Sequence, residues 1–136
     1  MQKRFFFPIF LLTLSFFTLF SCEKDEGKLP AIEFKTGAGY VSADKTVAQG
    51  ETVLVGIDAS KTEDKDVLKT FNVSVSFDGG ASTSLLTQTL SGSEGDHFET
   101  DFPITARNQA GTEKYTFTVT NRDGLTNSVA LTLTVQ

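Results

Sequence analysis

Residues 115–135 read Tyr-Thr-Phe-Thr-Val-Thr-Asn-Arg-Asp-Gly-Leu-Thr-Asn-Ser-Val-Ala-Leu-Thr-Leu-Thr-Val. Apolar side chains alternate with small residues, mainly threonine, on both sides of the run Asn121-Arg122-Asp123-Gly124. Alternation with a period of two is typical of a β-strand that buries one face and exposes the other. The central run predicts a tight turn in which Gly or Asp has a positive φ. The stretch therefore predicts two antiparallel strands joined as a hairpin.

The same alternation recurs from residue 31 to the end of the chain. It is strong in residues 52–57 and 71–77, and weaker in residues 31–35, 83–90 and 96–105. No stretch of this region repeats apolar residues at helical spacing. Short strands separated by Gly, Asn, Asp and Ser turns are typical of a Greek-key sandwich. We predict that residues 31–136 form an all-β domain, an immunoglobulin-like Greek-key β-sandwich of about seven antiparallel strands.

The alternation also predicts which aromatic side chains point into the core. They are Phe71, Phe77, Phe98, Phe102, Tyr115 and Phe117. Tyr115 is open to two interpretations: a tyrosine corner, whose hydroxyl bonds back to the loop at 108–111, or a half-buried aromatic. Pro103 has no backbone N–H, so its strand is expected to lie at a sheet edge or to be bulged there.

The chain begins with residues typical of a signal peptide. Lys3 and Arg4 precede an uncharged, mostly apolar stretch at residues 5–20, and the small residue Ser21 follows it. A helix over this stretch would be about 24 Å long, short of the ~30 Å hydrocarbon core of a bilayer. We therefore predict that residues 1–21 are removed.

Cys22 is the only cysteine and follows Leu19-Phe20-Ser21. These residues resemble the lipobox of bacterial lipoproteins, which implies cleavage before Cys22 and covalent lipid on its thiol. At ~0.8 kcal/mol per buried methylene, several acyl chains hold a protein stably in a membrane. The alternative is a secreted protein with a free thiol or an intermolecular disulfide.

The next residues, Cys22-Glu23-Lys24-Asp25-Glu26, resemble the export signal of Bacteroidota-type surface lipoproteins. The resemblance implies that Lys24, Asp25 and Glu26 direct the protein to the outer membrane, anchored and facing the cell exterior. The alternatives are a location on the periplasmic face and a purely solvated role for this charged segment. Residues 22–30 form a polar tether that spans at most about 30 Å.

Removal of residues 1–21 changes the charge balance. The remaining 115 residues hold 10 basic and 17 acidic side chains, so the net charge is 10 − 17 = −7. This length suits one domain with a core of its own. An acidic chain argues against nucleic acid as a partner, and membrane contact is expected only through the lipid at Cys22.

A second resemblance covers part of the domain. Gly111-Thr112 and the hairpin quoted above resemble the last two strands of PKD-like and other bacterial immunoglobulin-like domains. Thr46-Val-Ala-Gln-Gly-Glu-Thr-Val is similar to the start of their second strand. The resemblance implies a domain without catalytic residues that serves as a spacer or a binding module on the cell surface.

Candidate catalytic and metal-binding residues are few. His97 is the single histidine and is predicted to face solvent, and no Gly-x-Ser-x-Gly run is present, so neither enzyme activity nor a cofactor is predicted. Residues 63–66 do not match the Asp-x-Asp-x-Asp-Gly calcium pattern, and no metal site is predicted. A calcium ion stays open as the alternative to a solvated acidic surface at Glu94, Asp96, Glu99 and Asp101.

Candidate binding residues follow from topology, because successive loops of an antiparallel sandwich lie at opposite ends. The segments at 43–50, 78–80 and 107–109 and the C-terminus are predicted at the end away from the tether. There Arg107, with Asn108 and Asp78, is the candidate contact for a carboxylate, and its alternative role is an exposed loop charge. Tyr40 is a candidate platform for a sugar ring, or else a tyrosine packed over the sandwich.

Together these features predict a lipid-anchored, non-catalytic module for binding or assembly at the cell surface, with a protein or glycan ligand at the distal loops. The alternative is an accessory glycan-capture lipoprotein of an outer-membrane uptake system.

We expect Cys22→Ser to move the protein from the membrane fraction to the soluble fraction, because the acyl chains are its only strong anchor. Fractionation of cells followed by a carbonate wash measures this. A variant that stays with the washed membranes would rule out the lipoprotein interpretation.

Overall fold

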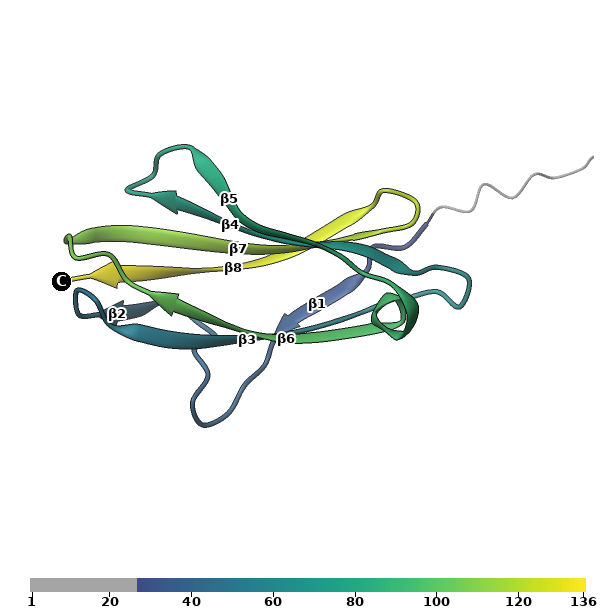
Figure 1. The fold of residues 1–136 in the computed structure, drawn as a ribbon, viewed down its shortest axis with the longest axis horizontal. Helices are drawn as coiled ribbons and strands as arrows, with labels where there is room; N and C mark the ends of the chain where they lie inside the picture. The colour runs from purple at the N-terminus through teal and green to yellow at the C-terminus, as the bar shows by residue number, and fades with distance from the viewer. Residues whose placement is uncertain (1–26) are drawn as a thin grey trace, which may run out of the picture.

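The computed structural model describes residues 27–136, so Cys22, Lys24, Asp25 and Glu26 lie outside the described residues. The described part is a sandwich of strands (Figure 1). The strands are β1 (Ala31–Phe34), β2 (Lys45–Val47), β3 (Thr52–Ser60), β4 (Leu68–Phe77), β5 (Ser82–Thr89), β6 (His97–Thr105), β7 (Gly111–Asn121) and β8 (Thr126–Val135). A 3-10 turn, η1 (Gly92–Gly95), precedes β6. The all-β prediction is confirmed.

Two sheets of unequal width pack face to face. The narrow sheet has the order β1-β3-β6, and the wide sheet has the order β2-β8-β7-β4-β5. The chain crosses between the sheets after β1, β2, β3, β5 and β6, as in a Greek key, and β4–β5 and β7–β8 are the consecutive strands that share a sheet. Nothing in residues 27–136 forms an apolar helix of membrane-spanning length.

The strand β2 is an addition to the seven strands expected from the sequence. It pairs in parallel with β8, from Lys45 opposite Leu133 to Val47 opposite Val135, whereas the other strand pairs are antiparallel. Three residues are too few to show a period of two. The strand therefore forms because β8 offers it backbone partners, not because of its own pattern.

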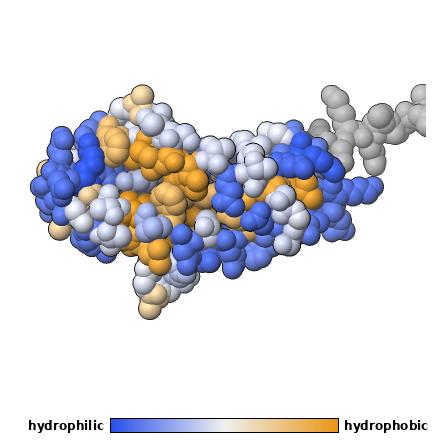
Figure 2. Space-filling model, viewed as in Figure 1, coloured by the Kyte–Doolittle hydropathy of each residue, from blue (hydrophilic) through white to orange (hydrophobic). Residues whose placement is uncertain are grey.

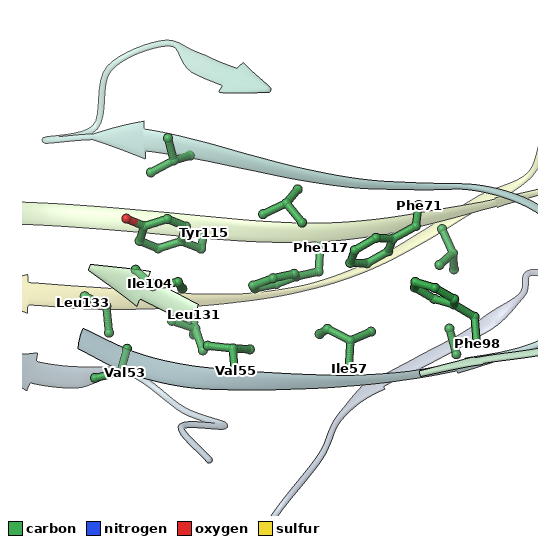
Figure 3. Packing of buried hydrophobic residues seen from close by; sticks show 14 of the residues in the cluster. Val53, Val55, Ile57, Phe71, Phe98, Ile104, Tyr115, Phe117, Leu131 and Leu133 are labelled. Atoms are coloured by element: carbon green, nitrogen blue, oxygen red, sulfur yellow. The ribbon is translucent and has the colours of Figure 1, made fainter. Parts of the chain in front are cut away.

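The core lies between the inward faces of the two sheets (Figure 3). Val55 and Ile57 of β3 are fully buried, as are Phe71 of β4 and Phe117 of β7. The Phe117 ring meets Phe102 edge-on with centroids 5.9 Å apart, a favoured geometry for aromatic pairs. These contacts join the middle of the wide sheet to the narrow one.

Two sequence predictions about strand positions have different outcomes. Pro103 lies on β6, which is an edge strand, as expected for a residue without an N–H. The inward assignment of Phe77 is wrong, because its side chain is 39% exposed. Phe77 is the last residue of β4 and extends beyond the core, where the guanidinium of Arg107 lies 4.3 Å from its ring centroid.

The turn between β7 and β8 has the predicted form. Gly124 has a φ of 81°, a left-handed conformation that suits glycine. The side-chain oxygen of Asn121 accepts hydrogen bonds from the N–H groups of Asp123 and Leu125, at 3.1 and 2.8 Å. Asn121 also donates to the buried carboxylate of Asp66 at 2.6 Å, which ties the turn to the loop before β4.

The segments 48–51, 78–81 and 106–110 meet near Gln136, at the end away from residue 27 (Figure 1), and we call this the distal end. The N–H of Gly50 donates to the carbonyl of Ala106 at 3.2 Å, and the N–H of Gln49 donates to that of Gln136 at 3.2 Å. The loop placement predicted from alternating ends is therefore the observed one.

A buried carboxylate holds the distal end together. Glu113 is 0% exposed, and its Oε1 accepts hydrogen bonds from the backbone N–H and the Nε of Arg107, both at 2.9 Å. Its Oε2 accepts the hydroxyl of Tyr115 at 2.8 Å. Burial and this bond raise the pKa of Tyr115. Tyr115 therefore bonds to Glu113 rather than to the loop at 108–111, and with 5% of its surface exposed it is buried, so neither sequence interpretation is correct.

Arg107 also bonds on its other side. Its Nη2 donates to Asp78 Oδ2 at 3.1 Å, while Asp78 Oδ1 accepts the N–H of Thr112 at 2.8 Å. The Arg107 side chain is only 26% exposed. Arg107 is thus neither a free contact residue nor an exposed loop charge, because Glu113 and Asp78 occupy its guanidinium.

We expect Arg107→Ala to lower the melting temperature by several degrees, because it removes the cation beside Glu113 and an uncompensated buried charge is strongly destabilising. Arg122→Ala is the matched control, since Arg122 is half exposed and pairs only loosely with its neighbour Asp123, at 3.8 Å. Thermal unfolding followed by circular dichroism measures both. An unchanged melting temperature for Arg107→Ala would contradict a structural role for the network.

Acid pH tests the Asp78 side of the network. The N–H of Thr112, and then Arg107, hold the pKa of Asp78 below its ordinary value of 3.8. A carboxylate with a lowered pKa stabilises the folded state above its unfolded pKa, and this contribution is lost as the pH falls through the folded pKa. The wild type should therefore melt above Asp78→Asn near neutral pH, and the difference should shrink below about pH 4. Asn tolerates the left-handed φ of 53° at this position. A pH-independent difference in melting temperature would contradict the assignment.

Candidate functional site

The structure brings three of the predicted binding residues together and separates the fourth from them. Arg107, Asn108 and Asp78 lie at the distal end, and Asn108 is exposed there. A Cβ on Gly50 would come within 2.9 Å of Asn108 Oδ1, so the loops carrying these two residues are in close contact. Tyr40 lies elsewhere, in the segment between β1 and β2, where its backbone forms a parallel bridge with Leu54 of β3.

Tyr40 packs over the sandwich, as in the second of its two interpretations. Its ring covers Gly56 of β3, where an added Cβ would lie 2.8 Å from Tyr40 Cε1. The hydroxyl donates to the carboxylate of Asp101 at 3.1 Å, and this bond raises the pKa of Tyr40. The half-buried ring is therefore held against the sheet rather than offered as a free flat face.

The wide sheet ends on one side in strand β5, and we call residues 82–89 the β5 edge. The strand β5 pairs with β4 alone, and all of its residues except Gln88 are exposed. It carries no charged residue and no proline. Natural edge strands are commonly protected from further pairing by charges, proline or bulges. The other edge on this side of the sandwich, β6, carries Pro103 and several charged residues, whereas β5 has neither a charge nor a proline and has a bulge at Leu85 instead.

A bulge shapes the β5 edge. The register shifts so that Ser74 is opposite Ser84 and Val73 is opposite Leu86, which leaves Leu85 as the extra residue. Asn72 holds this conformation, since its Nδ2 donates to Ser84 Oγ at 2.7 Å and to the carbonyl of Leu86 at 2.8 Å. Both leucines are consequently exposed, by 51% and 37%. Two adjacent leucines in an uncharged strand interrupt the period of two, which was the sequence signal for this feature.

The space-filling view supports an apolar surface on this side. Figure 2 shows apolar atoms gathered along the middle of the view, between the two sheets and in the half away from the N-terminal segment. Of the four large hydrophobic side chains that are exposed among residues 27–136, three belong to β4 and β5, namely Phe77, Leu85 and Leu86. The wide sheet thus ends in an exposed strand beside an apolar surface.

Two open, shallow pockets lie in the described part of the chain. One of about 270 Å³ is lined by residues that include Val41, Leu54 and Pro103. A second of about 190 Å³ lies among acidic residues near Asp66 and Asp123. Both are smaller than the roughly 300–1,000 Å³ usual for small-molecule sites. The β5 edge, a surface rather than a pocket, is therefore the candidate functional site.

Comparison with protein-family models and with curated proteins yields no match for this chain. Solved structures do resemble it. Superoxide reductase (neelaredoxin) from Ignicoccus hospitalis has a TM-score of 0.54 at 10% identity, over 80% of this chain and 81% of that one. A conjugate transposon protein from Bacteroides vulgatus has a TM-score of 0.46 at 11% identity, over 78% and 84% of the two chains. At these identities the likeness to the reductase extends to the β-sandwich fold alone.

Proposed function

We propose that the protein is a lipid-anchored, non-catalytic binding module at the cell surface, and that its β5 edge binds an extended segment of a partner protein. The observation that carries the proposal is an exposed, uncharged edge strand with two solvent-exposed leucines. An added strand would pair with the unbonded backbone groups of β5 and extend the wide sheet. Its side chains would also cover the exposed side chains of Leu85 and Leu86.

The predicted anchor supports this location for the module. Cys22 in its lipobox and Lys24-Asp25-Glu26 in the export signal favour an outer-membrane protein that faces outward. The tether spans at most about 30 Å, and its described residues, 27–30, lie at the end of the sandwich opposite the distal end. The strand β5 begins just after the 78–81 turn of the distal end, where a partner outside the cell has access.

The chemistry of the β5 edge suits a polypeptide better than a sugar. It offers backbone N–H and C=O groups with leucine side chains, which match an extended peptide. Sugar rings stack on flat exposed aromatics, and Tyr40 is held against Gly56 and Asp101. The glycan-capture alternative has no specific observation in its favour.

Site-specific photo-crosslinking on intact cells tests this proposal. With a photoreactive amino acid in place of Leu85, we expect ultraviolet light to link the protein to one partner of different mass, because Leu85 lies on the docking surface. The matched control carries the same amino acid in place of Lys65, which is exposed in the loop between β3 and β4 near the tether end. This control should give no such product.

Two results would overturn the proposal. Absence of a product at position 85, or equal products at positions 85 and 65, would show that the β5 edge is not a binding surface. A product of twice the chain's own mass would show self-association instead of partner binding.

A further inference from the structure

One row of side chains on the outer face of the narrow sheet holds three carboxylates. Glu33 of β1 is opposite Asp58 of β3, and Asp58 is opposite Glu99 of β6. Glu33 and Glu99 are exposed and Asp58 is half-buried, so none belongs to the core. Like charges directly opposite each other on neighbouring strands destabilise a sheet. A cation at this row would offset the repulsion.

The positive charge that the chain supplies to this face is small. Lys35 Nζ lies 3.8 Å from Glu99 Oε2 and 3.2 Å from Asp101 Oδ1. Counting Asp101 in the next row, the face has four carboxylates against this one lysine, a net charge of 1 − 4 = −3 while His97 is neutral. The excess negative charge therefore favours a cation from solution.

His97 lies beside this row and adds an imidazole nitrogen to its carboxylate oxygens. It lies two residues before Glu99 on the same face of β6, and its Nε2 is 2.9 Å from Asp58 Oδ1 and 4.0 Å from Glu99 Oε1. One ligand atom from each of these three residues lies within 4.8 Å of the other two. An imidazole nitrogen with carboxylate oxygens suits zinc, whereas calcium takes oxygen ligands alone.

We propose that Asp58, His97 and Glu99 form a binding site for a divalent transition-metal ion, with Zn²⁺ as the ion to test. Bonds of about 2.0–2.2 Å in a tetrahedral site put ligand atoms about 3.4 Å apart. Rotation of these partly exposed side chains brings the three atoms to that spacing while the strands stay in place. The proposal goes beyond the binding function of the β5 edge and does not depend on it.

A bound ion would link β3, which carries Asp58, to β6, which carries His97 and Glu99. It would replace the hydrogen bond between His97 and Asp58 and neutralise the repulsion between Asp58 and Glu99. Three protein ligands leave a fourth position for water or for a group from outside. Because the ion binds only the folded arrangement, it would also raise the melting temperature.

The test uses the full chain, purified in detergent without a histidine tag and titrated with ZnCl₂. Because the chain has a single histidine, the imidazole signals in an NMR spectrum belong to His97 and should shift on addition of zinc. Calorimetry should give one ion per chain. His97→Ala and Asp58→Asn should each weaken binding at least about tenfold. Asp64→Asn, at an exposed loop acid outside the site, is the control and should bind as the wild type does.

Other outcomes of the same titrations would contradict the proposed zinc site. Zinc that leaves the imidazole signals unchanged, or that binds His97→Ala as tightly as the wild type, would overturn the proposal. Calcium binding with the same affinity in the wild type and in His97→Ala, without any effect of zinc, would show an oxygen-only site and overturn it as well. Melting curves of each variant without metal establish that it is folded before the titration.

Discussion

The two sheets of this protein differ in width, since five strands pack against three. Most buried apolar side chains lie on strands where the two sheets face each other, and the fully buried aromatics Phe71 and Phe117 come from β4 and β7. The outermost strand of the wide sheet, β5, pairs with β4 and is exposed along nearly its whole length. Hydrophobic burial therefore cannot hold β5 in place, and its backbone bonds with β4 and the side chain of Asn72 do so instead. The same constraint leaves the outer backbone edge of β5 unpaired within residues 27–136.

At the distal end the controlling element is a buried charge rather than an apolar contact. Removal of a carboxylate from water is costly unless hydrogen bonds and an opposite charge compensate for it. Glu113 receives both from Arg107 and a further bond from Tyr115. Arg107 in turn bonds to Asp78, so three separate segments are positioned around one carboxylate. A cluster that looks like a surface binding site in the sequence is thus part of what keeps the loops together.

The outer face of the narrow sheet is organised by charge. Its alternate residues have no opposing layer and are free to be polar, and register places Glu33, Asp58 and Glu99 in one line. Lys35 and Tyr40 donate hydrogen bonds to the neighbouring Asp101. Within the line, the nearest side chain to Asp58 is that of His97, which is hydrogen-bonded to it. The proposed zinc site follows from this imbalance. It lies on a different sheet from the β5 edge, so the proposed metal binding and the proposed partner binding can be tested separately.

The sequence by itself determined the class of fold, because alternation with a period of two is a local property that each strand carries. It also predicted the hairpin at Gly124 and the grouping of loops at two ends, which depend on turn chemistry and strand order, and it limited Pro103 to an edge or a bulge, of which the structure shows the edge. Only the tertiary structure decided which residues of different strands lie opposite each other. The alternation along β4 predicted that Phe77 points inward. It could not show that the end of β4 extends beyond the core, which leaves Phe77 exposed. The partners of Arg107 and the line from Glu33 to Glu99 depend on register between strands far apart in the chain, and register is set by how the two sheets pack, not by any one strand.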